Sequence, residues 1–170
     1  MDSSVDRRVV SISSRGPGET TVRAIVQSGF RIEAFLQGQS RAHGVFQDFT
    51  GRVRRRFSID LSGTMEGDTL VLQEAFLFDD GAVEDRIWRI SPDGQRYTAT
   101  AQDMIGQARG KVEGDILRWS YLFSLKLGER RLEVRFRETF LQIAEDAVLN
   151  TARVSKFGFE IGRTTIVFRR

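Results

Sequence analysis

The chain has 170 residues, of which 40% are hydrophobic and 29% are charged, and its formal net charge is +3. This composition is typical of one soluble globular domain, and so small a basic excess gives only weak support for nucleic acid or anionic lipid as a partner. Cys is absent, which excludes disulfides, thiolate metal sites, Cys nucleophiles and a lipoprotein Cys anchor.

The N-terminal region predicts a flexible leader followed by a short helical segment. It lacks the apolar core of a secretory signal, so we expect a cytoplasmic protein. Residues 1–20 are rich in Ser and charged residues and are interpreted as the leader, while residues 21–170 are expected to form a single domain. Between Thr21 and Gln37 the apolar spacing predicts one or two short helices, broken at Gly29, that cover one end of the domain.

After Gly38 the chain alternates between apolar and polar residues almost to its end, and Gly and Asp mark most of the separators. Short strands at regular spacing indicate an all-β fold, here an antiparallel up-and-down barrel of about ten strands. The predicted strands are 41–48, 53–62, 69–78, 83–91, 96–103, 107–113, 116–126, 131–142, 148–156 and 160–169.

The hairpin from Leu70 to Ile90 carries the clearest pattern, with a turn predicted at Asp79-Asp80-Gly81. Counting back from this turn opposes Leu72 to Trp88, Glu74 to Arg86 and Phe76 to Glu84. One interpretation is that Glu74 and Arg86 form a polar anchor inside an apolar cavity. The alternatives are a purely structural cross-strand pair, or a register shifted by one residue that turns Arg86 outward.

Alternation along the remaining strands gives an inner face that is aromatic and aliphatic with few polar groups, as in a ligand cavity. The predicted ligand-binding residues are Glu74, Phe76, Arg86, Trp88, Asp103, Trp119, Tyr121, Phe123, Phe136 and Asn150.

The sequence supports a catalytic or metal site less well than it supports a ligand cavity. His43 is the single His, and one His without Cys cannot build a zinc site of the usual kind, so we predict no metal and no cofactor. A haem axial role for His43 is a minor alternative. Glu74, Asp103 and Glu138 could act as acids or bases if burial raises their pKa values, although pairing with basic groups is the competing interpretation.

A basic run, Arg52 with Arg54-Arg55-Arg56, lies beside Phe49 and Phe57. Strand alternation places Arg55 on the opposite face from its two neighbours, so a solvated strand edge is the favoured interpretation. Phosphate headgroups or a nucleic-acid backbone are the alternatives, with nucleic acid disfavoured.

The motifs FLQG, DFTGRVRRRF, LQEAFLFDDG, DRIWRI, YTATAQDMIGQARG, LRWSYLFSL and VLNTARVSKFGF follow one another in the chain. In order and spacing they resemble a bacterial family catalogued as domain of unknown function 3833, over about residues 33–170. The resemblance implies a lipocalin-like (calycin-type) barrel and no established activity. Many members carry a lipoprotein signal, so the resemblance implies envelope association as the alternative to a cytoplasmic location. This sequence has no such signal and no Cys, which argues against a membrane anchor. The pattern is also similar, at the level of fold, to fatty-acid-binding and nitrobindin-type barrels.

We therefore expect the barrel to bind or carry a hydrophobic, anionic small molecule such as a fatty acid or lipid, with Arg86 and Tyr121 holding its head. A non-catalytic role is favoured over an enzymatic one. The first alternative is an enzyme that acts on a lipid-like substrate with Glu74 or Asp103 as base. The second is an interaction module with a filled barrel and a basic outer face. An anionic membrane surface is an alternative partner that the sequence supports only weakly.

Overall fold

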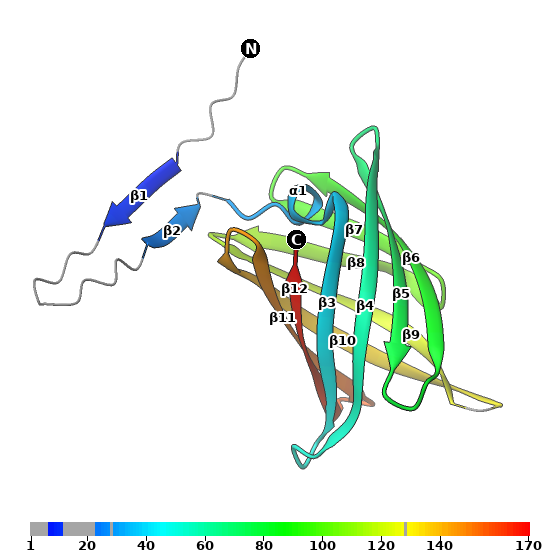
Figure 1. Cartoon of the computed structure of the whole chain (residues 1–170). Coiled ribbons are helices and arrows are strands. Elements are labelled where there is room, and N and C mark those ends of the chain that lie inside the picture. Colours follow the sequence, from blue (N-terminus) through cyan, green and yellow to red (C-terminus); the bar gives the residue numbers. More distant parts are fainter. Residues whose placement is uncertain (1–6, 12–22, 28, 128) are drawn as a thin grey trace, which may run out of the picture.

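A closed antiparallel barrel dominates the computed structural model, which describes residues 7–11, 23–27, 29–127 and 129–170. Each barrel strand pairs with its neighbours in sequence, and β12 pairs with β3 to close the ring (Figure 1). The strands are β3 Gly38–Asp48, β4 Val53–Glu66, β5 Thr69–Phe78, β6 Val83–Asp93, β7 Arg96–Ala101, β8 Met104–Glu113, β9 Ile116–Leu127, β10 Arg130–Ala144, β11 Ala147–Lys156 and β12 Phe159–Arg169. The predicted barrel of about ten strands is confirmed.

The β5–β6 hairpin adopts the predicted register. Gly81 has a φ of +81°, a left-handed conformation that Gly adopts without steric cost, and the Phe78 amide donates to the Ala82 carbonyl at 2.9 Å. Leu72 then pairs with Trp88, Glu74 with Arg86 and Phe76 with Glu84. This register directs Glu74 and Trp88 into the barrel, so the alternative of a shifted register is excluded.

The N-terminal region differs in part from its prediction. The structure has a strand, β2 Arg23–Gln27, where a first helix was expected, and this strand pairs with β1 Arg7–Ser11. A single helix, α1 Ile32–Leu36, follows Gly29 and confirms the short helical segment. Residues 1–6 and 12–22 lie outside the described residues, so the flexible leader and the domain boundary at residue 21 stay predictions.

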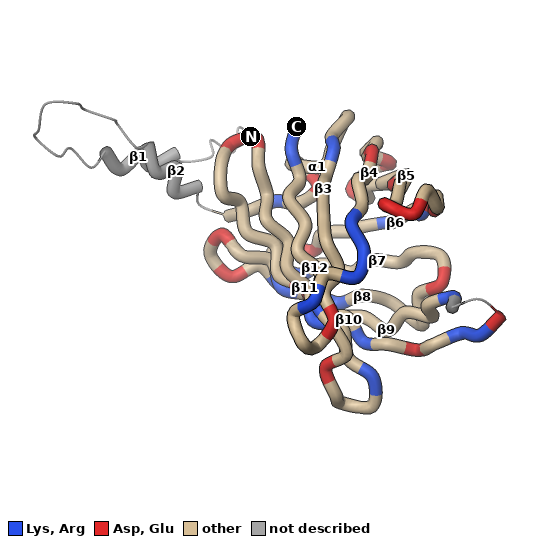
Figure 2. Tube along the Cα trace, turned by 60° about the horizontal axis from the view of Figure 1, so that its bottom comes forward, with Lys and Arg blue, Asp and Glu red and all other residues tan. Residues whose placement is uncertain are grey.

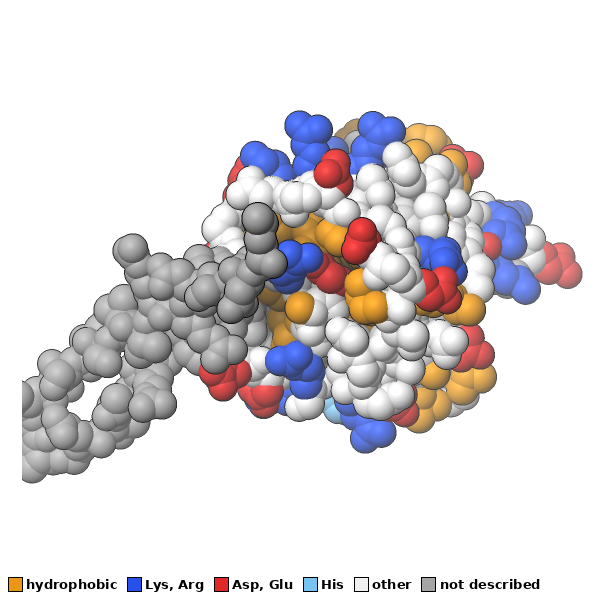
Figure 3. All heavy atoms as spheres, turned by 90° about the horizontal axis from the view of Figure 1, so that it is seen from above, with side chains coloured by type: hydrophobic (Ala, Val, Ile, Leu, Met, Phe, Trp, Pro, Cys, Tyr) orange, Lys and Arg blue, Asp and Glu red, His pale blue; other side chains and the backbone are white. Residues whose placement is uncertain are grey.

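Helix α1 covers one end of the barrel, called here the α1 end, which Figure 3 views from above. Ile32, Phe35 and Leu36 are buried against the inner face, and hydrophobic burial of this kind is the main force that holds so short a helix. Gly63 makes the close approach possible, because a Cβ there would lie 2.0 Å from the Leu36 carbonyl oxygen. Glu33 is also buried, and it accepts a hydrogen bond from the Tyr97 hydroxyl at 2.7 Å.

The opposite end of the barrel, called here the far end, carries the β3–β4, β5–β6, β7–β8, β9–β10 and β11–β12 turns. Its inner residues are apolar but only partly buried: Phe46, Phe57, Phe76, Met104, Leu125, Leu132, Phe136 and Ile161. Helix α1 therefore covers the α1 end of the barrel, whereas apolar side chains remain partly accessible to solvent at the far end. In the described part of the chain, no helix is long and apolar enough to cross a membrane.

Candidate functional site

Two carboxylates from opposite walls of the barrel meet in its interior. Glu74 on β5 accepts a hydrogen bond from Trp88 Nε1 at 3.0 Å, and Glu138 on β10 accepts one from Trp119 Nε1 at 2.7 Å. The two indole rings stack with centroids 5.8 Å apart and an interplanar angle of 9°. The Tyr121 hydroxyl donates to the second oxygen of Glu138 at 2.8 Å. A ladder of aromatic donors therefore holds both acids in place.

Arg86 supplies the positive charge of this interior cluster, and its side chain is 22% exposed. Its guanidinium lies 5.0 Å from the Phe76 ring centroid and 4.7 Å from that of Phe123, both within cation–π range. Across the described residues its one ion pair within 4 Å is with Glu84, at 3.8 Å. The predicted Glu74–Arg86 ion pair is thus wrong as a contact, although the two residues are direct cross-strand neighbours.

The electrostatics of the cluster follow from burial. Burial raises the pKa of Glu74 to about 7, against the opposing effects of the Arg86 charge and the Trp88 hydrogen bond. Burial also raises the pKa of Glu138, opposed by the hydrogen bonds from Trp119 and Tyr121 and by the charge of Arg86. The pKa of Tyr121 lies well above its usual value, because the phenol is buried beside Glu138. Burial therefore favours the neutral, protonated form of both acids.

Little empty space remains around these groups. The interior cavity has a volume of about 60 Å³ and is lined by Glu74, Arg86, Trp88, Trp119, Tyr121, Glu138, Asn150 and the apolar residues between them and α1. A ligand pocket typically measures about 300–1,000 Å³, whereas a water molecule occupies about 30 Å³ in the liquid. The expected ligand-sized void is therefore not present in this conformation, and aromatic side chains fill the barrel.

Nine of the ten predicted site residues lie on the inner face. Glu74, Arg86, Trp88, Trp119, Tyr121 and Asn150 line the cavity together with Phe76. Phe123 and Phe136 pack next to Tyr121, with the Phe136 ring stacked on it at 5.1 Å. Asn150 is buried, and its side-chain amide donates to the Thr139 carbonyl at 3.4 Å.

Asp103 is the exception, and its predicted inward position is wrong. Strand β7 ends at Ala101, and Asp103 lies in the turn that follows, with a φ of 62°. Its side chain is 46% exposed and is ion-paired with Arg131 at 2.7 Å. The second acid in the interior, beside Glu74, is Glu138. Alternation had placed it on the inner face, but sequence reasoning did not count it among the ligand-binding residues.

The remaining candidates lie on the outer surface. His43 is exposed, because its neighbour Ala42 is the residue that turns inward, so it cannot serve a group bound inside the barrel. The basic run of β4 is opposed by nearby acids: Arg54 pairs with Asp48 at 2.6 Å and Arg56 with Asp79 at 3.7 Å. Among the residues whose placement is described, no group of His, Cys, Asp and Glu side chains could hold a metal ion.

An outer groove of about 800 Å³ lies over strands β8 to β12, where Figure 2 shows Lys and Arg on neighbouring strands. Arg137, Arg153 and Arg163 are direct cross-strand partners in one row across this groove. Arg109 and Arg118 lie in the same groove. Sequence reasoning missed this surface, although each of the three row members stands at an outward position of its strand.

Fold and interior define a class: closed, ten-stranded antiparallel barrels whose aromatic interior holds a small polar cluster. Within that class the chain belongs to the family described as "Protein of unknown function (DUF3833)", which it matches over residues 11–170.

Two solved structures have a fold similar to that of this chain. The S-type phycobiliprotein lyase CPES from Guillardia theta is 8% identical, with a TM-score of 0.61, and the match covers 82% of this chain and 90% of that one. A protein of unknown function from the DUF3598 family of Nostoc punctiforme is 17% identical, with a TM-score of 0.55, covering 96% of this chain and 61% of that one. At such identities the likeness is one of fold. No curated protein sequence matches the chain.

Proposed function

We propose that the barrel binds a small, hydrophobic molecule with an anionic head, such as a fatty acid or another acidic lipid. The observation that carries the proposal is the position of Arg86. Its partly exposed guanidinium lies at the far-end side of an aromatic interior, and its one ion pair with a described residue is the long contact of 3.8 Å with the half-exposed Glu84. A cation placed over aromatic rings at the mouth of an apolar interior suits the acidic end of an apolar molecule.

Charge balance supports an anionic head. Arg86 faces two carboxyl groups whose pKa values are raised by burial, and Glu74 titrates at about 7. A protonated Glu74 can donate a hydrogen bond to an anion, while Arg86 neutralises the anion's charge. When both acids are protonated, Arg86 carries the one charge of the cluster, and a single anionic group balances it.

The ligand must make its own room, because the interior cavity measures about 60 Å³. The side chains at the far end are the ones to move, since they are only partly buried and fringe the mouth of the barrel. A thin alkyl chain displaces fewer of them than a bulky ring system does, so the geometry favours a single-chain ligand. The fold is shared with a phycobiliprotein lyase, which shows that similar barrels occur in proteins with a biochemical activity.

The test compares a fluorescent long-chain fatty acid with its methyl ester. Arg86→Gln should weaken binding of the acid by about 10- to 100-fold, since a hydrogen bond to a charged group contributes about 1.5–3 kcal/mol, and should leave the ester unaffected. The matched control is Arg89→Gln on the same strand, where the side chain points outward and pairs with Glu66 at 2.6 Å. Equal losses for acid and ester, or no uptake of either by the wild type, would contradict the proposal.

A second candidate function is acid–base catalysis on such a ligand, favoured by the pKa of Glu74 at about 7, where a carboxyl group exchanges protons readily. Asp103 is withdrawn as the base because it lies outside the interior. Turnover of a lipid-like substrate should then show an inflection near pH 7 that Glu74→Gln removes. A rate that survives this change would exclude Glu74 from the chemistry.

A further inference from the structure

Three phenylalanines at the far end stand almost fully in solvent. Phe49, Phe157 and Phe159 are 75%, 88% and 78% exposed, the highest values for large hydrophobic side chains in the described part of the chain. They come from two hairpins that lie side by side, because β12 pairs with β3 (Figure 1) and the register opposes Gly162 to Asp48, close to both turns. We call this set the phenylalanine tip.

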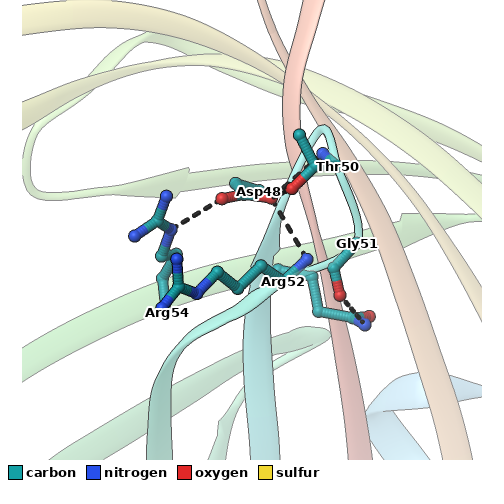
Figure 4. Close-up of polar contacts among 6 residues, drawn as sticks. Asp48, Thr50, Gly51, Arg52 and Arg54 are labelled. Atoms are coloured by element: carbon teal, nitrogen blue, oxygen red, sulfur yellow. Dashed lines mark hydrogen bonds and ion pairs between the residues drawn. The ribbon is translucent and has the colours of Figure 1, made fainter.

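The β3–β4 turn, which carries Phe49, is braced by hydrogen bonds around Asp48 (Figure 4). The Asp48 carboxylate accepts hydrogen bonds from the Thr50 amide at 3.0 Å, the Thr50 hydroxyl at 2.6 Å, the Arg52 amide at 3.1 Å and Arg54 Nε at 2.6 Å. Gln47 Nε2 donates to the Gly51 carbonyl at 2.9 Å. A turn tied at so many points presents its exposed ring to solvent instead of letting it fold back onto the barrel.

The β11–β12 turn presents Phe157 at a steric cost. Lys156 pairs with Phe159, so Phe157 and Gly158 form a two-residue loop with φ values of 51° and 85°. Both central residues of such a type I′ turn need positive φ, which makes Asn-Gly the favoured sequence. A bulky Phe at the first position is a strained choice, and strain of this kind is typically retained where a side chain has a function.

Basic residues surround the tip. Residues 47–54 and 153–163 contain five basic and two acidic residues. The two acids are already engaged, Asp48 with Arg54 and Glu160 with Arg163. For Arg52, Arg153 and Lys156 the structure records no ion pair with any described residue, and the Lys156 ammonium lies 5.0 Å from the Phe157 ring centroid. Exposed aromatic rings within a collar of unpaired cations match the interfacial region of an anionic bilayer.

We propose that the far end of the barrel docks on an anionic lipid surface, with the phenylalanine tip inserted among the headgroups and Arg52, Arg153 and Lys156 against their phosphates. A second copy of the chain fits less well, because a symmetric contact through this end would oppose two sets of unpaired cations. The proposal does not depend on ligand binding, although docking here would bring the mouth of the barrel to the bilayer.

Vesicle flotation of the full chain tests the docking. Wild type should float with vesicles of phosphatidylcholine and phosphatidylglycerol, less so at high salt, and not with phosphatidylcholine alone. Phe157→Asn should raise the melting temperature, because Asn suits the turn, yet weaken vesicle binding about tenfold or more, because the inserted ring is lost. A higher melting temperature together with weaker vesicle binding would show that Phe157 serves docking and not the stability of the fold.

The matched control is Ile143→Asn, which removes a 53% exposed apolar side chain near the β10–β11 turn at the α1 end and should leave flotation unchanged. Flotation that survives Phe157→Asn, or that Ile143→Asn reduces equally, would overturn the proposal. Equal binding to neutral vesicles, or a lipid-free dimer that Phe157→Asn dissociates, would overturn it too. Arg86→Gln should leave flotation intact, so failure of ligand binding and failure of docking are distinguishable.

Discussion

Each buried acid in the barrel depends on a particular aromatic donor. Trp88 and Trp119 stack on each other and each gives its indole N–H to one carboxyl group. A buried carboxylate without a partner is very costly, so these donors allow Glu74 and Glu138 to occupy an aromatic interior. The compensation is incomplete, because burial still raises the pKa of both groups.

Because the pKa of Glu74 is raised on folding, we predict that the stability of the protein depends on pH. The pKa of Glu74 rises from an ordinary value of 4.5 to about 7 on folding, so the folded state binds the proton more tightly than the unfolded state. Wild-type stability should therefore fall as the pH rises from about 4.5 through 7, by about 2–3 kcal/mol. Glu74→Gln should flatten most of this slope in urea unfolding measured across the pH range.

The control for that series is Glu84→Gln, on the adjacent strand, where the side chain is largely exposed. This variant should keep the wild-type slope. A Glu74→Gln protein with the wild-type slope would show that the proton is held elsewhere, with Glu138 as the next group to replace.

Sequence reasoning placed most interior residues correctly but not all of their contacts. Alternation fixes the face of a side chain and not its rotamer, so it could oppose Glu74 to Arg86 without revealing that Trp88 takes the carboxylate. Asp103 failed for a different reason. Strand β7 ends at Ala101, and alternation carries no information beyond the last residue of a strand.

At the scale of elements, three neighbouring strands carry like charges side by side. Arg137, Arg153 and Arg163 are direct partners across β10, β11 and β12, and only Arg163 in this row has an ion pair with a described residue, Glu160. Like charges that face each other across strands are destabilising. The row therefore costs stability in the isolated protein.

Arg153→Thr should raise the free energy of unfolding by about 0.2–1 kcal/mol at low salt, because it removes the middle charge of the row. The gain should shrink in about 1 M salt, where the screening length falls to about 3 Å. Urea unfolding at both salt concentrations measures it. Arg41→Thr, which instead breaks an ion pair with Asp60 at 2.7 Å, should show no gain. A gain for Arg153→Thr that salt does not change would indicate strand propensity instead of repulsion.

The strands were predictable because two local signals agreed. Alternation marked each strand and a Gly-containing turn marked most of the boundaries, as at Gly81 and Gly94. Arg23–Gln27 lacked both signals, since five residues with an uneven apolar pattern fit a helix as well as a strand. The pairing of β12 with β3 was inferred from the expectation of closure and not from any local pattern.

For the whole molecule, the contrast between the two ends is the main structural result. Helix α1 is buried over the α1 end. The far end combines partly buried apolar residues, the phenylalanine tip, and cations for which no ion pair with a described residue is recorded. The sequence predicted the barrel fold but not the small volume of its interior cavity. How much space a ring of strands leaves depends on how side chains from all walls interlock, and the stacked Trp88, Trp119, Tyr121 and Phe136 leave about 60 Å³.

The closing pair β3–β12 also bears on how the protein is made. Among the barrel strands described, every other pairing joins consecutive segments and can form locally, whereas Arg41 meets Arg169 only after the eight strands between β3 and β12 have been synthesised. Arg170 then donates to the Ala34 carbonyl of α1 at 3.3 Å, so the helix also gains a contact from the last residue. Until β12 has formed, the edge of β3 therefore lacks its partner strand, and an unpaired edge of this kind favours aggregation during folding.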